Sequence, residues 1–275
     1  SSGNATDANF AVVMPVYEDQ EASTRLFREL FAEYGTRAYV VAVDDGSINQ
    51  PVQIEALQSA GVKGVVTTLK RNVGHQRAIA IGLNYVAEHM PEMPCTIVMD
   101  SDGEDTPQSI RELVEPMQSP KVDVVVAQRK SRVETWRFKA FYVVYKALFQ
   151  FLTGRKISFG NFMALKPAAL KRLAAMQELW MHVAACVLTS KLRVQTQPID
   201  RGPRFAGKSK MNFVGLALHG FRALMVFAED VLVRVGIICA FVALFTVGAS
   251  VVAIALKLAG FATPGWFSVA LGILL

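Results

Sequence analysis

The chain has 275 residues, of which 52% are hydrophobic, and its formal net charge is +6 at pH 7. This length admits one large domain or two small ones, and a mean hydropathy of +0.31 is high for a soluble protein. The basic charge favours an anionic partner, but no recognition motif indicates nucleic acid. Three scattered cysteines argue against both a disulfide framework and a zinc site, and they fit a reducing compartment.

Residues 10–127 alternate between two hydrophobic patterns. Short apolar runs bounded by polar residues predict strands, and the longer amphipathic stretches between them predict helices. This alternation is typical of βαβ units on a mostly parallel sheet. A dinucleotide site is disfavoured because no G-x-G-x-x-G motif follows the first strand. The predicted strands are 10–16, 38–43, 64–69, 95–99 and 122–127, and the predicted helices are 21–33, 51–60, 75–89 and 108–117.

The C-terminal part of the chain is more apolar. Residues 133–152 predict an aromatic-rich helix that faces either a core or a membrane surface, and 211–228 predict an amphipathic helix at a membrane interface. Residues 235–256 carry no charge and as a helix would be roughly 33 Å long, enough to cross a hydrocarbon core of about 30 Å. A second apolar run begins near residue 264 and is cut short by the chain end. The polar first ten residues predict no signal peptide.

Polar side chains follow three of the predicted strands. Tyr17 and Glu18 follow the first strand, Asp44 and Asp45 end the second, and an Asp-x-Asp pair follows the fourth. Because the carboxyl ends of parallel strands face one crevice, we expect these groups to converge although they are far apart in sequence. One Asp-Asp-Gly-Ser segment alone would be an ordinary turn. Three such sites at successive strand ends indicate a binding site.

The fourth strand ends in four carboxylates within six residues, from Asp100 to Asp105. Two carboxylates one residue apart can share a divalent cation, and that cation can hold a diphosphate. The alternative is a helix start, in which residues 105–107 cap the next helix and acidic groups suit its dipole. That alternative explains Asp105 but not Asp100, so a metal or nucleotide site is favoured.

Four segments carry a family resemblance, beginning at Pro15 (PVYE), Val43 (VDDGS), Arg71 (RNVGHQ) and Met99 (MDSD). In order and spacing they resemble the inverting family 2 glycosyltransferases, in particular the polyprenyl-phosphate glycosyltransferases related to dolichyl-phosphate mannosyltransferase. The resemblance covers nearly the whole chain. It implies an α/β GT-A fold, Rossmann-like with a mostly parallel sheet flanked by helices, followed by C-terminal transmembrane helices.

The resemblance also implies residues that bind the nucleotide-sugar donor. Pro15, Tyr17 and Glu18 would line the nucleoside pocket, and Asp44 would reach the base or the ribose. Further donor contacts are expected from Asp45, Gln76 and Ser101.

The same resemblance implies a metal site. Asp100 and Asp102 would hold the donor diphosphate through Mg²⁺ or Mn²⁺. Many relatives carry glutamine two residues after the second aspartate, whereas this chain has Glu104. Glu104 is therefore either a third metal ligand or a residue that faces the sugar.

The acceptor side is expected to be basic. A phosphate monoester carries about −1.5 to −2 charges at neutral pH, so a lipid phosphate needs positioning and neutralisation rather than a strong general base. Arg129 aligns with an acceptor-phosphate arginine of the family. Further candidates, which positive-inside charge alone would also explain, are Arg201, Arg204, Lys208 and Lys210.

The predicted activity is transfer of one sugar from a UDP- or GDP-sugar to undecaprenyl or dolichyl phosphate. The alternatives are a processive polysaccharide synthase, whose Gln-x-x-Arg-Trp motif is absent here, and a non-catalytic membrane-tethered nucleotide-sugar binder. The residues expected to act in catalysis are Asp102, Glu104 and Arg129.

The expected organisation places the catalytic domain on the cytoplasmic face of an inner or plasma membrane, because basic residues precede the span. Apolar surface near the membrane is compatible with a homo-oligomer. The expected parts are a disordered or non-native leader (1–9), a catalytic domain (10–210), an interfacial helix (211–230) and a transmembrane region (231–275).

Overall fold

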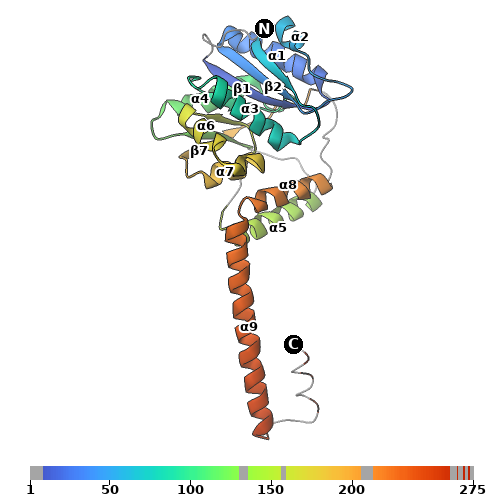
Figure 1. Cartoon of the computed structure of the whole chain (residues 1–275), viewed down its shortest axis with the longest axis vertical. Coiled ribbons are helices and arrows are strands. Elements are labelled where there is room, and N and C mark those ends of the chain that lie inside the picture. The colour runs from blue at the N-terminus through green and yellow to red at the C-terminus, as the bar shows by residue number, and fades with distance from the viewer. Residues whose placement is uncertain are drawn as a thin grey trace. The chain divides into compact units, whose positions relative to one another are not determined.

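The computed structural model describes residues 9–129, 136–155, 159–205 and 213–260, together with Gly265, Val269 and Gly272. Two compact units are present: Ser1–Val143 with Lys156–Val226, and Val144–Arg155 with Phe227–Leu275. The first unit contains the sheet and its helices, and the second contains the long helix α9 (Figure 1).

The described residues of the first unit form a seven-stranded sheet of order β3-β2-β1-β4-β6-β5-β7. Among these strands, β6 alone is antiparallel to both of its neighbours, and the other pairs are parallel. The six parallel strands therefore end at one edge, called here the carboxyl edge. The strands are β1 (Phe10–Val16), β2 (Ala38–Asp44), β3 (Lys63–Thr68), β4 (Thr96–Val98), β5 (Val124–Arg129), β6 (Met163–Leu165) and β7 (Val194–Ile199).

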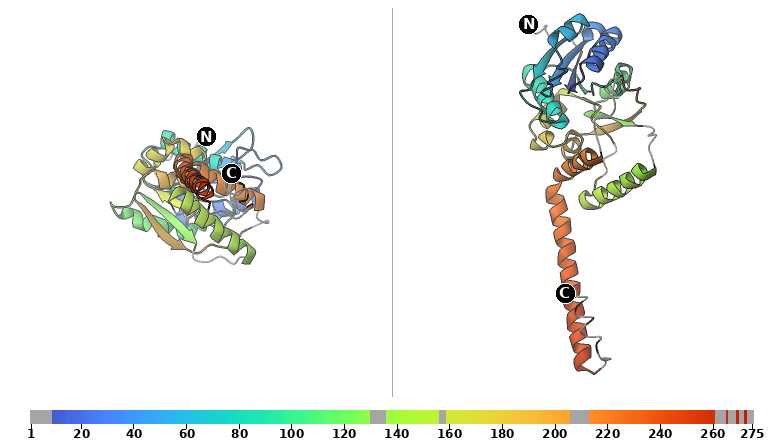
Figure 2. Two further views of the ribbon diagram at one scale, coloured as in Figure 1. Left: turned by 90° about the horizontal axis from the view of Figure 1, so that it is seen from below. Right: turned by 90° about the vertical axis from the view of Figure 1, so that its right-hand side faces the viewer.

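Helices cover both faces of the sheet (Figures 1 and 2). Successive residues of a strand point to opposite faces, so Val13 joins one hydrophobic layer whereas Val12 and Met14 join the other. The layer with Val13 includes residues of α3 (His75–His89), α6 (Pro167–Ala174) and α7 (Val183–Thr189). The opposite layer includes residues of α1 (Gln20–Tyr34), α2 (Ile54–Ser59) and α4 (Ile110–Val114). Burial on both faces explains why β1 and β2 are continuous apolar runs.

This architecture confirms the expected α/β class and mostly parallel sheet. The five predicted strands are present as β1 to β5, and three predicted helices are present as α1, α2 and α3. The helical stretch predicted near 108–117 is also present, as α4 flanked by the 3-10 turns Pro107–Ser109 and Glu115–Gln118. Pro107 and Pro116 lack a backbone N–H and suit the first turn of a helix, and each stands in the first turn of one of these 3-10 segments. The strands β6 and β7 were not predicted.

Three helices complete the described chain: α5 (Trp136–Thr153), α8 (Phe213–Met225) and α9 (Ala228–Leu258). In α9, an 18-residue window has a mean hydropathy of 2.6 and only 6% of it is buried. This helix is long and apolar enough to cross a membrane, and its exposure distinguishes it from a core helix. Within the second unit, the rings of Phe149 and Phe227 meet edge to face at 5.6 Å. Apart from Gly265, Val269 and Gly272, the predicted second span lies outside the described residues.

Candidate active site

The loop after β2 is organised by carboxylates at the carboxyl edge. Asp44 is fully buried, and its two oxygens accept the backbone N–H groups of Ser47 at 2.8 Å and Val52 at 2.7 Å. Glu18, which follows β1, accepts the N–H of Gln50 at 2.8 Å and donates its own N–H to the Ser47 hydroxyl at 2.8 Å. The loops after β1 and β2 are thereby joined.

Asp45 joins the same edge to the start of α3. Its two oxygens accept the N–H groups of Val73 at 2.7 Å and Gly74 at 2.9 Å. Burial raises the Asp45 pKa, and these two hydrogen bonds oppose the rise. In the first turn of α3, Gln76 is buried, and its carbonyl accepts the N–H of Val183 at 2.8 Å. Gln76 therefore links α3 to the start of α7.

The remaining donor-side residues differ in exposure. Pro15 is buried within β1, and Ser101 is buried in the turn after β4. Tyr17 is 43% exposed at the end of β1. The loops that contain the predicted donor-binding residues thus lie at the carboxyl edge of the sheet. Contact between these residues and a nucleotide stays a prediction.

The loop that follows β4, residues 100–105, is called here the acidic loop. The N–H of Asp100 donates to Asp105 at 3.2 Å, and the N–H of Glu104 donates to Asp102 at 3.0 Å. Gly103, between Asp102 and Glu104 in the sequence, has a φ of +82°. Burial raises the pKa of both Asp102 and Asp105, and repulsion from Asp100 adds to the rise in each case.

The loop that follows β7, residues 200–205, is called here the arginine loop. Because β7 runs parallel to β5, the arginine loop leaves the sheet at the same edge as the acidic loop. Arg204 Nη2 lies 2.8 Å from Asp102 Oδ2 and 3.4 Å from Glu104 Oε1. Arg201 pairs through Nη1 with Glu104 Oε2 and through Nη2 with Asp105 Oδ1, the latter at 3.4 Å. Burial lowers the Arg201 pKa, but the surrounding carboxylates outweigh it and raise the pKa overall.

Backbone hydrogen bonds also join these two loops. The N–H of Gly202 donates to the Glu104 carbonyl at 2.9 Å, and the N–H of Phe205 donates to the Asp102 carbonyl at 2.9 Å. The Arg25 guanidinium of α1 lies 4.0 Å from the centroid of the Phe205 ring, which is a cation–π distance. The two loops therefore form one paired structure, and sequence analysis missed the contribution of Phe205 to it.

We expect Gly103→Ala to lower the free energy of unfolding by about 1–3 kcal/mol. A methyl group at Gly103 would lie 2.4–2.5 Å from three atoms of the Phe205 ring, and the positive φ is unfavourable for alanine. Thermal unfolding of the full chain measures the effect. In a Phe205→Ala background, Gly103→Ala should cost less stability, because only the backbone strain at position 103 remains. An equal loss of stability in both backgrounds would contradict the contact between position 103 and the Phe205 ring.

His75 stands at the N-terminus of α3 beside the acidic loop. Its Nε2 lies 3.3 Å from Asp100 Oδ1 and 3.2 Å from the side-chain nitrogen of Asn161. Burial lowers the His75 pKa, but the carboxylates of Asp100, Asp102 and Asp45 raise it overall. The imidazole therefore links Asp100 to the segment that precedes β6.

The predicted acceptor residues are described to different extents. Arg129 is the last residue of β5, at the carboxyl edge, and its side chain lies outside the description. Lys208 and Lys210 lie outside the described residues. Arg201 and Arg204 are described, and both contact the acidic loop.

The donor set of the acidic loop suits Mg²⁺ or Mn²⁺ in chemical type. Within the described ranges, no group of three or more His, Cys, Asp or Glu side chains is arranged to hold a metal ion. Mg²⁺ is usually bound by one or two carboxylates, with waters and substrate phosphates as its other ligands. Asp100 and Asp102 are of the chemical type that such a site needs, and their role as metal ligands stays a prediction.

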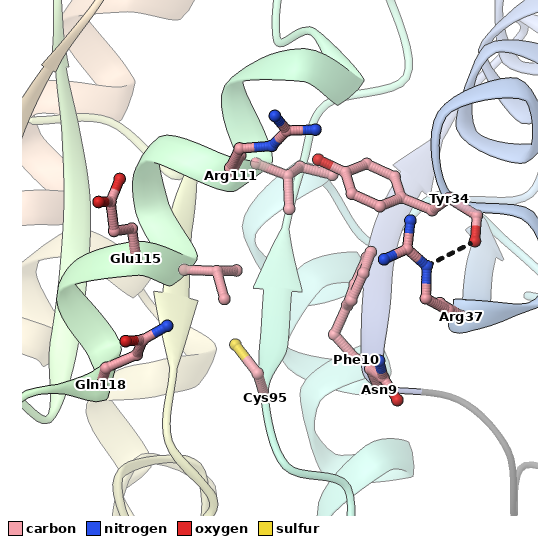
Figure 3. A pocket seen from close by; sticks show the side chains of 10 residues that line it. Asn9, Phe10, Tyr34, Arg37, Cys95, Arg111, Glu115 and Gln118 are labelled. Atoms are coloured by element: carbon pink, nitrogen blue, oxygen red, sulfur yellow. Dashed lines mark hydrogen bonds between the residues drawn. The ribbon is translucent and has the colours of Figure 1, made fainter.

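A separate cavity of about 470 Å³ lies at the opposite edge of the sheet, beside the first residue of β1 (Figure 3). Its lining includes Phe10, Tyr34 and Arg111, and Arg37 donates to the Tyr34 carbonyl there at 3.3 Å. Burial raises the pKa of the Cys95 thiol in this cavity to about 12, so the thiol is a poor nucleophile. The carboxyl edge is the stronger candidate for the active site.

The mostly parallel sheet with an Asp-x-Asp loop at its carboxyl edge is the GT-A fold, as the family match and a solved structure of the same fold show. The family model of glycosyl transferase family 2 matches residues 11–180. The chain belongs to this family.

Several curated relatives are named as undecaprenyl-phosphate sugar transferases. The chain is 28% identical over 213 residues to undecaprenyl-phosphate 4-deoxy-4-formamido-L-arabinose transferase of Edwardsiella ictaluri (strain 93-146), covering 75% of this chain and 64% of the relative. It is 31% identical over 150 residues to the protein of the same name from Sodalis glossinidius (strain morsitans), covering 53% and 44%. The chain thus spans less than two thirds of the length of these relatives.

A solved structure with the same fold is glucosyl-3-phosphoglycerate synthase from Mycobacterium tuberculosis, in complex with Mn²⁺, UDP and glucosyl-3-phosphoglycerate. The TM-score is 0.55, the identity is 15%, and the alignment covers 84% of this chain and 81% of that chain. At this identity the likeness establishes the fold alone.

Proposed function

We propose that this protein transfers one sugar from a nucleotide-sugar to a polyprenyl phosphate, with inversion at the anomeric carbon. The observation that carries the proposal is the pairing of the acidic loop with the arginine loop at the carboxyl edge. Carboxylates suited to a cation and guanidiniums suited to a phosphate thus lie side by side. The names of the curated relatives support the lipid-phosphate acceptor.

On the donor side, Asp100 and Asp102 would hold Mg²⁺ or Mn²⁺. The cation would neutralise charge on the leaving nucleoside diphosphate. The joined loops that contain Glu18, Asp44 and Asp45 would bind the nucleoside. A protein of the same fold was solved in complex with Mn²⁺ and UDP, which supports a divalent cation and a nucleoside diphosphate as ligands here.

On the acceptor side, the chain would position an ionised phosphate rather than deprotonate a hydroxyl group. Arginine presents a planar fork of donors that matches phosphate oxygens, and its charge reduces repulsion between the acceptor and the donor diphosphate. Arg201 and Arg204 are proposed for this role. The further candidates are Arg129, Lys208 and Lys210.

The proposed location is a membrane surface, with the catalytic part in the cytoplasm. Helix α9 would anchor the chain where a polyprenyl phosphate is available. Basic residues near a span favour the cytoplasmic side, and the loop before α8 and α9 carries several of them.

The test is a transfer assay with the purified full chain, undecaprenyl phosphate and a panel of labelled nucleotide-sugars, with and without Mn²⁺. We expect one class of donor to label the lipid, only when a divalent cation is present. Undecaprenol, which lacks the phosphate, is the matched control and should stay unlabelled. Polymeric products would contradict single transfer, and labelled undecaprenol would contradict a phosphate nucleophile.

A further inference from the structure

Glu104 is shared between two arginines. Its Oε2 pairs with Arg201 Nη1, and its Oε1 lies 3.4 Å from Arg204 Nη2. Its carbonyl oxygen also accepts the N–H of Gly202 at 2.9 Å. Both the side chain and the backbone of Glu104 therefore hold the arginine loop.

The arginines retain access to a ligand while they are held. The side chains of Arg201 and Arg204 are 23% and 27% exposed, so each is partly buried but reachable. A guanidinium has five N–H donors in a fixed fork, and the contacts given above for Arg204 use only its Nη2. Because the guanidinium is rigid, carboxylates that bind the N–H groups on one side also fix the direction in which its other N–H groups point.

From this geometry, and on the basis of the proposed function, we infer that Glu104 is a positioning residue for the acceptor phosphate. It acts through Arg201 and Arg204, whose guanidiniums it holds at the edge of the acidic loop. Both carboxylate oxygens of Glu104 contact a guanidinium, Oε2 that of Arg201 and Oε1 that of Arg204, which favours positioning over metal ligation as its role. Glu104 thus couples the loop that binds the donor to the residues that bind the acceptor.

The test is Glu104→Gln in the full chain, which keeps the side-chain shape but removes the charge. We expect the KM for undecaprenyl phosphate to rise about tenfold, because charge-assisted hydrogen bonds to both arginines weaken. The Kd of Mn²⁺ measured by electron paramagnetic resonance in the presence of UDP should change less than about twofold, since Asp100 and Asp102 are retained. Glu33→Gln is the matched control, because Glu33 pairs with Arg111 at 3.3 Å outside the site, and its KM should equal that of the wild type.

A double-mutant cycle separates action through the arginines from a general structural role. In an Arg201→Gln/Arg204→Gln background, Glu104→Gln should raise the KM for lipid phosphate no further. A further tenfold rise in that background would overturn the inference. So would an unchanged KM in the single variant, or a tenfold weaker Kd for Mn²⁺ with the KM unchanged. A wild-type chain that transfers no sugar to lipid phosphate would instead refute the proposed function itself.

Discussion

Replacing Asp102 with asparagine is expected to reduce sugar transfer by roughly 10²–10³-fold while the chain stays folded. The substitution removes a charge proposed to hold the cation at the donor diphosphate. It also removes one of the two carboxylate partners of Arg204, whose Nη2 lies 2.8 Å from Asp102 Oδ2 and 3.4 Å from Glu104 Oε1. The measurement is the initial rate with saturating nucleotide-sugar, Mn²⁺ and undecaprenyl phosphate.

Asp123→Asn is the matched control for this experiment. Asp123 also pairs with an arginine, since its Oδ1 lies 2.6 Å from Arg193 Nη2, but it precedes β5 and so lies at the edge opposite the acidic loop. The rate of this variant should equal that of the wild type. Full turnover in the Asp102 variant would refute the proposed metal role of the acidic loop.

Asp44→Asn is expected to lower the free energy of unfolding by about 2–3 kcal/mol and to weaken UDP binding as a consequence. Asp44 is fully buried, and asparagine has one acceptor oxygen for the two N–H groups of Ser47 and Val52. One buried N–H would then face the amide nitrogen without an acceptor. Thermal unfolding and calorimetric titration with UDP measure the two effects.

The two readouts distinguish between roles for Asp44. If Asp44 acts by holding the loop, both stability and UDP affinity fall together. If it also contacts the nucleoside directly, as the family resemblance implies, UDP affinity falls further than the loss of stability accounts for. Asp123→Asn again provides the comparison, because its ion pair is exposed and should contribute only about 0–1 kcal/mol.

The sequence predicted the part of the fold that is buried on both faces. Strand β1 and helix α3 match their predicted bounds, because an apolar run and a 3.6-residue periodicity are strong signals. Strand β6 has only three residues, too few to give a pattern. Strand β7 reads VQTQPI, in which exposed and partly buried positions alternate and Ile199 alone is buried, so it lacks the apolar run of a central strand.

The missed strand explains what the sequence could not predict about the site. The motifs that end β1, β2 and β4 were predicted to converge, and their loops do meet the carboxyl edge. Arg201 and Arg204 were predicted as acceptor candidates, but without β7 nothing placed them beside the acidic loop, so their pairing with it was not foreseen. The opposite charges of the acidic loop and the arginine loop were the available signal in the sequence. Charge alone, however, does not specify which carboxylate pairs with which arginine.

The pairing of the two loops also determines when the site is completed during synthesis. Glu104 precedes Arg201 by 97 residues and Arg204 by 100 residues. At about 5–20 residues per second, the ribosome makes the carboxylates roughly 5–20 s before the guanidiniums that neutralise them. Until then the emerging chain carries a cluster of like charges that has no internal counter-ion from the arginine loop. The arginine loop therefore pairs with the acidic loop late in the synthesis of the domain, just before the apolar helix α9 is translated.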